Sequence, residues 1–164
     1  MNKLAYWAAA IIAAALLGLP AEAAGPNAPS FELRSLDGKQ YASQNLIGRP
    51  TLLMFWASWC QVCQRELPKV RALQEKMKGK PLQVVTIGFA DTESNIRGYV
   101  TSHTAIFTFP VLYDTGDQVA TRFGVHSTPT LFLLNKKGEI EIAHRGGGLL
   151  ENEEFQSVLN RLLG

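Results

Sequence analysis

Short apolar runs alternate with amphipathic stretches along most of this 164-residue chain. Residues 51–57 and 82–89 are apolar runs of strand length without clean alternation, which is typical of strands covered on both faces. Between these runs, apolar residues recur at the spacing of one helical face, at Cys63, Leu67, Val70, Leu73 and Met77. The pattern predicts two central parallel strands joined by an amphipathic helix.

The remaining chain continues the alternation of strands and helices. Residues 31–34 and 40–42 flank an Asp37-Gly38 turn signal, which predicts a hairpin before the first central strand. After the second central strand, the expected elements are a helix at 94–102, a strand at 110–114, a short helix at 118–123, strands at 130–135 and 139–144, and a helix at 152–163. This order predicts an α/β layer fold.

The N-terminus carries the pattern of an export signal. Lys3 precedes an uninterrupted apolar stretch from Leu4 to Leu19, and Ala21-Glu22-Ala23 places small residues at the positions that a signal peptidase reads. We expect residues 1–23 to be a signal peptide, residues 24–30 a linker and residues 31–164 one domain. An uncleaved anchor at residues 4–19 is the alternative, because this stretch is only slightly shorter than the ~20 residues that span a bilayer. Both alternatives place the domain outside the cytoplasm, in the periplasm or its equivalent.

Composition and charge exclude several classes of protein. The chain is 46% apolar, with 16 basic and 14 acidic residues and a formal net charge of +2, which fits one globular core. No basic block is present, so we expect no nucleic-acid partner. Cys60 and Cys63 are the two cysteines of the whole chain, too few for a disulfide-rich scaffold or a four-cysteine zinc site.

The spacing of Cys60 and Cys63 at the predicted start of a helix indicates redox chemistry. Residues three apart on a helix lie close enough to form a disulfide with little backbone movement. Cys63 lies on the apolar stripe and should be buried. Cys60 lies in the first turn, where free N–H groups and the helix dipole favour an anion and lower a thiol pKa from about 8.5 into the range of about 3.5–7.5. We therefore assign Cys60 as the attacking thiolate and Cys63 as the resolving thiol.

Other interpretations of the cysteine pair have weaker support. A structural disulfide closing so short a loop would contribute only about 2 kcal/mol. A half zinc site would need two of His103, His126 and His144, which share no ligand spacing with the cysteines. Haem attachment requires a histidine directly after the second cysteine, and residue 64 is Gln64. We expect neither a metal nor a bound cofactor, with the electrons carried by the two cysteines themselves.

Three motifs together resemble a known family. The segment Phe55-Trp56-Ala57-Ser58-Trp59-Cys60-Gln61-Val62-Cys63, followed by Glu66-Leu67-Pro68, resembles the active-site strand and helix of thioredoxin-like proteins of the extracytoplasmic TlpA/ResA type. Gly124-Val125-His126-Ser127-Thr128-Pro129-Thr130 resembles their cis-proline loop, and Gly138-Glu139-Ile140 the hairpin after it. The similarity covers about residues 30–163, nearly the whole predicted domain.

The resemblance implies a thioredoxin fold with an N-terminal β-hairpin and an insertion after the second central strand, at about residues 90–114. It implies a cis peptide bond before Pro129 and pairing of the Thr128 backbone with a bound substrate chain. Asp91 falls where ResA-type proteins carry a buried glutamate, so it is the candidate proton relay between the sulfurs, with Glu93 the second choice. A solvated loop carboxylate that caps the next helix is the alternative. Trp59 is expected to form apolar surface beside Cys60.

For several further residues the sequence predicts burial or exposure. We expect Trp56 in the core, and Glu66 and Arg65 facing solvent, with Arg65 a candidate for partner docking. His126 is a candidate for the substrate rim, although loop histidines are usually plain surface residues. Pro68 should lie within the active-site helix and kink it.

The resemblance implies a thiol:disulfide oxidoreductase acting on protein disulfides, supplied by a membrane thiol-disulfide electron donor. We expect a monomeric reductant of the type that serves cytochrome c or metal-site maturation, by analogy with the family alone. A disulfide-forming oxidant is the alternative within this class. A thiol peroxidase is a further alternative, although the Pro and Thr of that motif are replaced by Leu53 and Ala57. A binding module with an idle disulfide is the third.

Overall fold

The computed structural model describes residues 25–164, which form one seven-stranded mixed sheet in the order β2-β1-β5-β4-β3-β6-β7. The central strands β3, β4 and β5 are mutually parallel, whereas β6 pairs antiparallel with β3 and with the edge strand β7. The strands are β1 (Glu32–Ser35), β2 (Gln40–Ala42), β3 (Thr51–Trp56), β4 (Gln83–Gly88), β5 (Val111–Tyr113), β6 (Thr130–Leu134) and β7 (Ile140–Arg145). The α/β fold with an N-terminal hairpin is confirmed.

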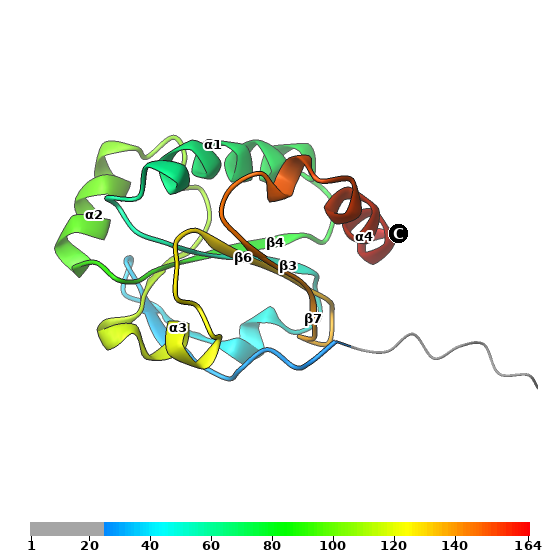
Figure 1. Ribbon diagram of the computed structural model, residues 1–164, viewed down its shortest axis with the longest axis horizontal. Helices are drawn as coiled ribbons and strands as arrows, with labels where there is room; N and C mark the ends of the chain where they lie inside the picture. Colours follow the sequence, from blue (N-terminus) through cyan, green and yellow to red (C-terminus); the bar gives the residue numbers. More distant parts are fainter. Residues whose placement is uncertain (1–24) are drawn as a thin grey trace, which may run out of the picture.

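Helices cover both faces of the sheet (Figure 1). The α-helices are α1 (Gln61–Lys76), α2 (Glu93–Ser102), α3 (Gln118–Arg122) and α4 (Glu153–Leu163). Three 3-10 segments lie between other elements: η1 (Ser43–Leu46) before β3, η2 (Thr115–Asp117) before α3 and η3 (Leu149–Glu151) before α4. Figure 1 shows α1, α2 and α4 on one side of the sheet, and α3 on the other.

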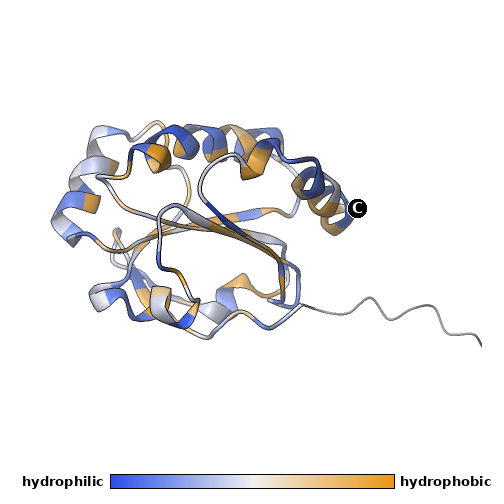
Figure 2. Ribbon diagram, in the orientation of Figure 1, coloured by the Kyte–Doolittle hydropathy of each residue, from blue (hydrophilic) through white to orange (hydrophobic). Residues whose placement is uncertain are grey.

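Alternation along β3 explains why the sheet has a core on each side. Leu52, Met54 and Trp56 point into the cluster that includes the buried residues of α1. Leu53 and Phe55 point the opposite way, into the cluster that contains α3 residues. Every residue of β3 is buried, as its continuous apolar sequence predicts for a strand covered on both faces. Figure 2 shows hydrophobic colour along these central strands and mixed colour on the helices around them.

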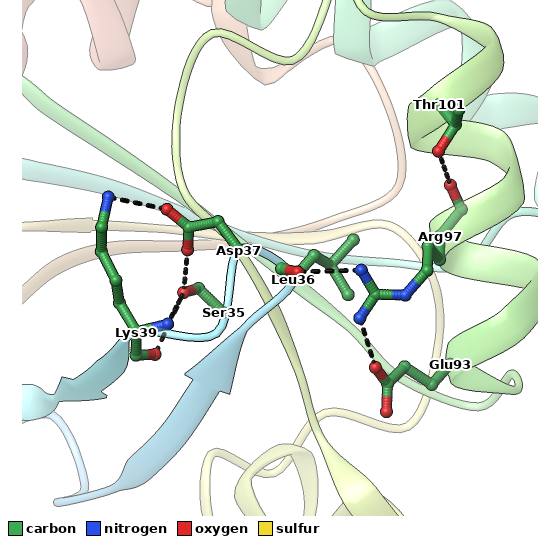
Figure 3. Close-up of polar contacts among 7 residues, drawn as sticks. All are labelled: Ser35, Leu36, Asp37, Lys39, Glu93, Arg97 and Thr101. Carbon is green, nitrogen blue, oxygen red and sulfur yellow. Dashed lines mark hydrogen bonds and ion pairs between the residues drawn. The ribbon is translucent and has the colours of Figure 1, made fainter.

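The insertion after β4 contains α2 and β5, and α2 is attached to the N-terminal hairpin (Figure 3). Arg97 of α2 donates from Nη1 to the carbonyl oxygen of Leu36 at 2.8 Å and pairs through Nη2 with Glu93 at 2.6 Å. In the hairpin turn, Lys39 forms an ion pair with Asp37 at 2.7 Å, and the Ser35 hydroxyl donates to the same carboxylate. The insertion and the hairpin therefore brace each other at one edge of the parallel strands.

The start of the described chain is paired with the sheet. The Ala28 N–H donates to the carbonyl oxygen of Gly138 at 2.9 Å, and the Ile140 N–H donates to that of Pro26 at 2.9 Å. Asn27 forms a bridge with Glu139 between them. Part of the predicted 24–30 linker is thus docked on the β6–β7 turn, because its backbone supplies the hydrogen bonds that the edge of β7 leaves open.

The predicted signal peptide or anchor falls on residues 1–23, outside the described residues. Within residues 25–164, none of the helices combines the length and apolar character that a membrane span requires.

Candidate active site

Cys60 and Cys63 form a disulfide at the N-terminus of α1, with their Cα atoms 5.2 Å apart. Cys60 is the N-cap residue, in an extended conformation, and its sulfur accepts a hydrogen bond from the Cys63 N–H at 3.1 Å. The first turn of α1 contains no acidic residue. A negative charge on the Cys60 sulfur would therefore meet an N–H donor and the positive end of a 16-residue helix.

The two sulfurs differ in access. Cys63 is fully buried and Cys60 is 5% exposed, so Cys60 offers the one surface at which a partner reaches the disulfide. The adjacent Trp59 is 61% exposed, whereas Trp56 at the end of β3 is completely buried. The predicted burial of Trp56 and Cys63 is confirmed, and the part of Trp59 in substrate binding stays a prediction. Cys60 lies deeper than a position at the start of a helix alone suggests.

The loop before β6 faces the disulfide. The Thr128–Pro129 peptide bond is cis, as predicted. The Thr128 Oγ1 lies 2.8 Å from the Cys63 sulfur, and since a disulfide sulfur carries no proton, the hydroxyl donates this hydrogen bond. The Gly146 N–H donates to the Pro129 carbonyl oxygen at 2.8 Å and holds the loop from the β7 side. The role of the Thr128 backbone in substrate pairing stays a prediction.

Asp91 is part of the site, but its contacts differ from those of the expected proton relay. Its Oδ2 accepts from the Ser58 N–H at 2.8 Å and the Ser58 hydroxyl at 2.6 Å. Its Oδ1 accepts from the Thr92 N–H at 2.7 Å and the Asn95 side chain at 2.9 Å. All four hydrogen bonds thus go to these three residues, and none goes to either cysteine. The carboxylate touches the turn that precedes Cys60, and a direct relay role stays a prediction.

The protonation of Asp91 follows from these contacts. Partial burial raises the pKa of this carboxyl, but the hydrogen bonds from Ser58, Asn95 and Thr92 outweigh burial and leave the pKa below its usual value. Asp91 is therefore a carboxylate at neutral pH. The N-cap of α2 is Thr92, whose hydroxyl accepts from the Asn95 N–H, so Asp91 lies beside this cap and binds its two residues.

Glu66 was expected to face solvent, and this expectation is wrong. Glu66 is 4% exposed, and its Oε1 accepts from Lys69 Nζ at 2.9 Å. Lys69 also pairs with Glu151 of η3 at 2.7 Å. A Cβ added to Gly147 would lie 2.9 Å from Glu66 Oε1 and 3.1 Å from a methyl carbon of Val62, so the missing side chain of Gly147 leaves room for the carboxylate. Glu66 follows Cys63 by three positions, and this helical spacing was the available signal.

Other candidate residues form none of the contacts of the disulfide described above. Arg65 and His126 are exposed, so their docking and rim roles stay predictions. His103 stacks on Tyr99, and His144 lies 3.1 Å from the Gly147 carbonyl oxygen. Within the described part of the chain, no three His, Cys, Asp or Glu side chains gather into a cluster that could hold a metal ion. Pro68 lies inside α1, which continues past it to Lys76.

Comparisons with known proteins agree with this geometry. The model of the AhpC/TSA family matches residues 24–143. Thioredoxin-like protein YneN of Bacillus subtilis is 34% identical over 125 residues, which cover 74% of this chain and 71% of that protein. Thiol-disulfide oxidoreductase ResA of Bacillus thuringiensis is 31% identical over 116 residues, covering 71% of this chain and 66% of the relative, slightly under two thirds of its length.

A solved structure extends the agreement to three dimensions. The crystal structure of a putative thiol:disulfide interchange protein DsbE from Chlorobium tepidum superimposes with a TM-score of 0.77 at 28% identity. The superposition covers 86% of this chain and 98% of that one. The whole described sheet and its helices thus follow a thioredoxin-like architecture.

Proposed function

The chain belongs to the AhpC/TSA family, and from that premise we propose that it is a thiol-disulfide oxidoreductase that uses Cys60 and Cys63. The observation that carries the proposal is the position of this disulfide, capped onto α1 and faced by the cis-proline loop, with its exposed edge at Cys60. The ResA and DsbE relatives are named for the same chemistry.

In the reducing direction, the Cys60 thiolate attacks one sulfur of a partner disulfide. A bond forms between Cys60 and that sulfur, and the other partner sulfur leaves as a thiolate. Cys63 then loses its proton and attacks the Cys60 sulfur, which expels the remaining partner thiolate and closes the Cys60–Cys63 disulfide. Two electrons pass from the protein to the partner. The oxidising direction reverses each step.

The surroundings of each sulfur fit these separate tasks. The N–H of Cys63 and the helix dipole stabilise negative charge on Cys60 before the attack. The Thr128 hydroxyl lies against Cys63 and can donate to this sulfur as it becomes anionic for the resolving step. Burial of Cys63 keeps partners away from it, so mixed disulfides form on Cys60.

The proposal extends to the direction of electron flow, the location of the protein and its partners. The N-terminal segment supports an extracytoplasmic protein, secreted or anchored. By analogy with its relatives, the protein reduces protein disulfides in cytochrome c or metal-site maturation and is recharged by a membrane thiol-disulfide donor. Residues Gln61 and Val62 between the cysteines set the potential, together with the first turn of α1.

Reduction of insulin by dithiothreitol, followed as turbidity, tests the activity. The wild-type protein should accelerate it, and Cys60→Ser should abolish the acceleration. An equal rate with both proteins would reject the enzyme in favour of a binding module. In parallel, Cys63→Ser should accumulate partner proteins as mixed disulfides on Cys60, and the Cys60→Ser protein is the matched control for that capture.

The reduction potential tests the direction. A value near ~−270 mV, as in thioredoxin, agrees with a reductant, whereas a value near ~−120 mV, as in a strong periplasmic oxidant, would reverse the assignment. Equilibration with glutathione or dithiothreitol buffers measures it.

A further inference from the structure

We propose that Asp117, at the end of η2, is a positioning residue that fixes the Trp59 surface beside Cys60 for binding of a protein partner; this rests on the proposed function. Asp117 does not touch either cysteine in the contacts described above. It acts through the segment 89–92, here called the bridging loop, which connects β4 to α2.

The connection consists of two consecutive hydrogen bonds through one residue. The N–H of Ala90 donates to Asp117 Oδ1 at 2.8 Å. The carbonyl oxygen of the same Ala90 accepts from the indole Nε1 of Trp59 at 3.0 Å. Asp117 therefore determines the orientation of the Ala90 backbone, and that backbone provides the polar partner of the indole.

Both residues of the hydrogen bond between Ala90 and Asp117 have an uncommon backbone conformation. Ala90 has φ +52° and Asp117 has φ +56°, the two positive φ angles among non-glycine residues of the described chain. Left-handed conformations of this kind are uncommon outside glycine, and they persist where surrounding contacts impose them. Here the two left-handed residues are hydrogen-bonded to each other, and their shared contact leads to the active-site turn.

A second anchor holds the bridging loop from β5. The Tyr113 hydroxyl donates to the Asp91 carbonyl oxygen at 2.8 Å, and the Asp91 side chain accepts from both donors of Ser58. Tyr113 of β5 and Asp117 of η2 thus both contact the bridging loop. The bridging loop in turn contacts the two residues that directly precede Cys60.

The arrangement matters because Trp59 is 61% exposed while the neighbouring Cys60 is only 5% exposed. A protein partner that brings its disulfide to Cys60 must cover the indole. A tryptophan already held in place loses less rotational freedom on binding, so its orientation contributes to partner affinity. A small disulfide reagent covers little of this surface and gains little from it.

Two substitutions distinguish the effect of the Asp117 side-chain oxygen from the effect of its backbone conformation. Asp117→Gly allows φ +56° without strain but removes the oxygen that holds Ala90. Asp117→Asn also tolerates the left-handed region and keeps a side-chain oxygen. In the Gly variant, the KM for insulin should rise about fivefold, which is the effect of losing one hydrogen bond. The Asn variant should stay close to wild type.

Activity with a small aromatic disulfide reagent gives the contrast. Its kcat/KM should be unchanged in both variants, because the cysteines keep their environment. An equal loss with insulin and with the small reagent would overturn the proposal, since it would indicate general damage to the site. Equal KM values for insulin in the Gly variant and wild type would overturn it as well.

Solvent exchange of the Trp59 indole N–H tests the proposal without an activity assay. The Trp59 Nε1–H signal, assigned in ¹⁵N spectra with Trp59→Phe, should exchange faster with solvent in Asp117→Gly and normally in Asp117→Asn. Tyr113→Phe, which removes the second anchor, should change it in the same direction. Unchanged exchange in Asp117→Gly would overturn the proposal. If wild type fails to reduce insulin while the indole behaves as expected, the proposed function fails and the positioning contact stands.

Discussion

The hydroxyl oxygen of Thr128 lies 2.8 Å from the sulfur of Cys63, across the gap between the cis-proline loop and the active-site helix. Residues 65 positions apart in the chain thereby share one hydrogen bond at the buried sulfur. The sulfur of a reduced Cys63 can both donate to and accept from this hydroxyl, whereas a disulfide sulfur only accepts, so the contact favours the reduced protein. The thiolate formed at Cys63 in the resolving step accepts the bond more strongly still.

Thr128→Val should therefore lower the reduction potential. Loss of a hydrogen bond of about 1 kcal/mol corresponds to a shift of about 20 mV for a two-electron couple. The resolving step should slow about fivefold, which is seen as a longer-lived mixed disulfide. Thr128→Ser keeps the hydroxyl and serves as the control; a Val variant that matches it in potential would contradict the role of this contact.

Alkylation of the reduced protein should occur first at Cys60. Its thiolate meets the Cys63 N–H and the start of α1, so the midpoint of its alkylation pH profile should fall below the ~8.5 of a free thiol. Measurement in Cys63→Ser isolates this group. A midpoint at the free-thiol value, or faster labelling of Cys63 than of Cys60 in wild type, would be incompatible with the assigned roles.

Gly147→Ala should destabilise the protein by about 1–2 kcal/mol, because the new methyl group would press on Glu66 and Val62. Gly98→Ala is the matched control: a Cβ there meets nothing within 4 Å and lies in α2, so helix propensity should stabilise by up to about 1 kcal/mol. Urea unfolding measures both. Equal stability changes of the two variants would argue against close packing of Gly147 on Glu66.

Acid should weaken the contribution of Asp91 to stability. Because hydrogen bonds lower its pKa in the folded protein below the unfolded value near 3.8, its contribution is complete above that value and is lost as the pH falls through the folded pKa. Asp91→Asn should cost about 1 kcal/mol at pH 7, a modest effect because the group is partly solvated.

The difference in unfolding free energy between wild type and Asp91→Asn should then shrink below about pH 4. A difference that stays constant from pH 7 to pH 2 would show that ionisation of Asp91 does not contribute. Thr92→Val, which removes a neighbouring cap of α2 without a titrating group, controls for local disruption.

The sequence by itself determined most helices and strands and the place of the cysteine pair in them. Continuous apolar residues in β3 and β4 predict strands covered on both faces, and the stripe through Cys63 and Leu67 predicts α1, because these patterns depend on local periodicity. The position of Cys60 at the start of that helix follows from the same spacing. The family resemblance added the cis bond before Pro129, which local preferences alone would not predict.

Only the tertiary structure decided which side chains surround the two sulfurs. Glu66 has a polar side chain, and its burial depends on Gly147 and Lys69, which approach from another loop and from the next helical turn. The contacts of Asp91 with Ser58 and of Ala90 with Asp117 join segments that are 33 and 27 positions apart. Such contacts arise where parallel strands end together at one edge of the sheet, and no local pattern in the chain records them.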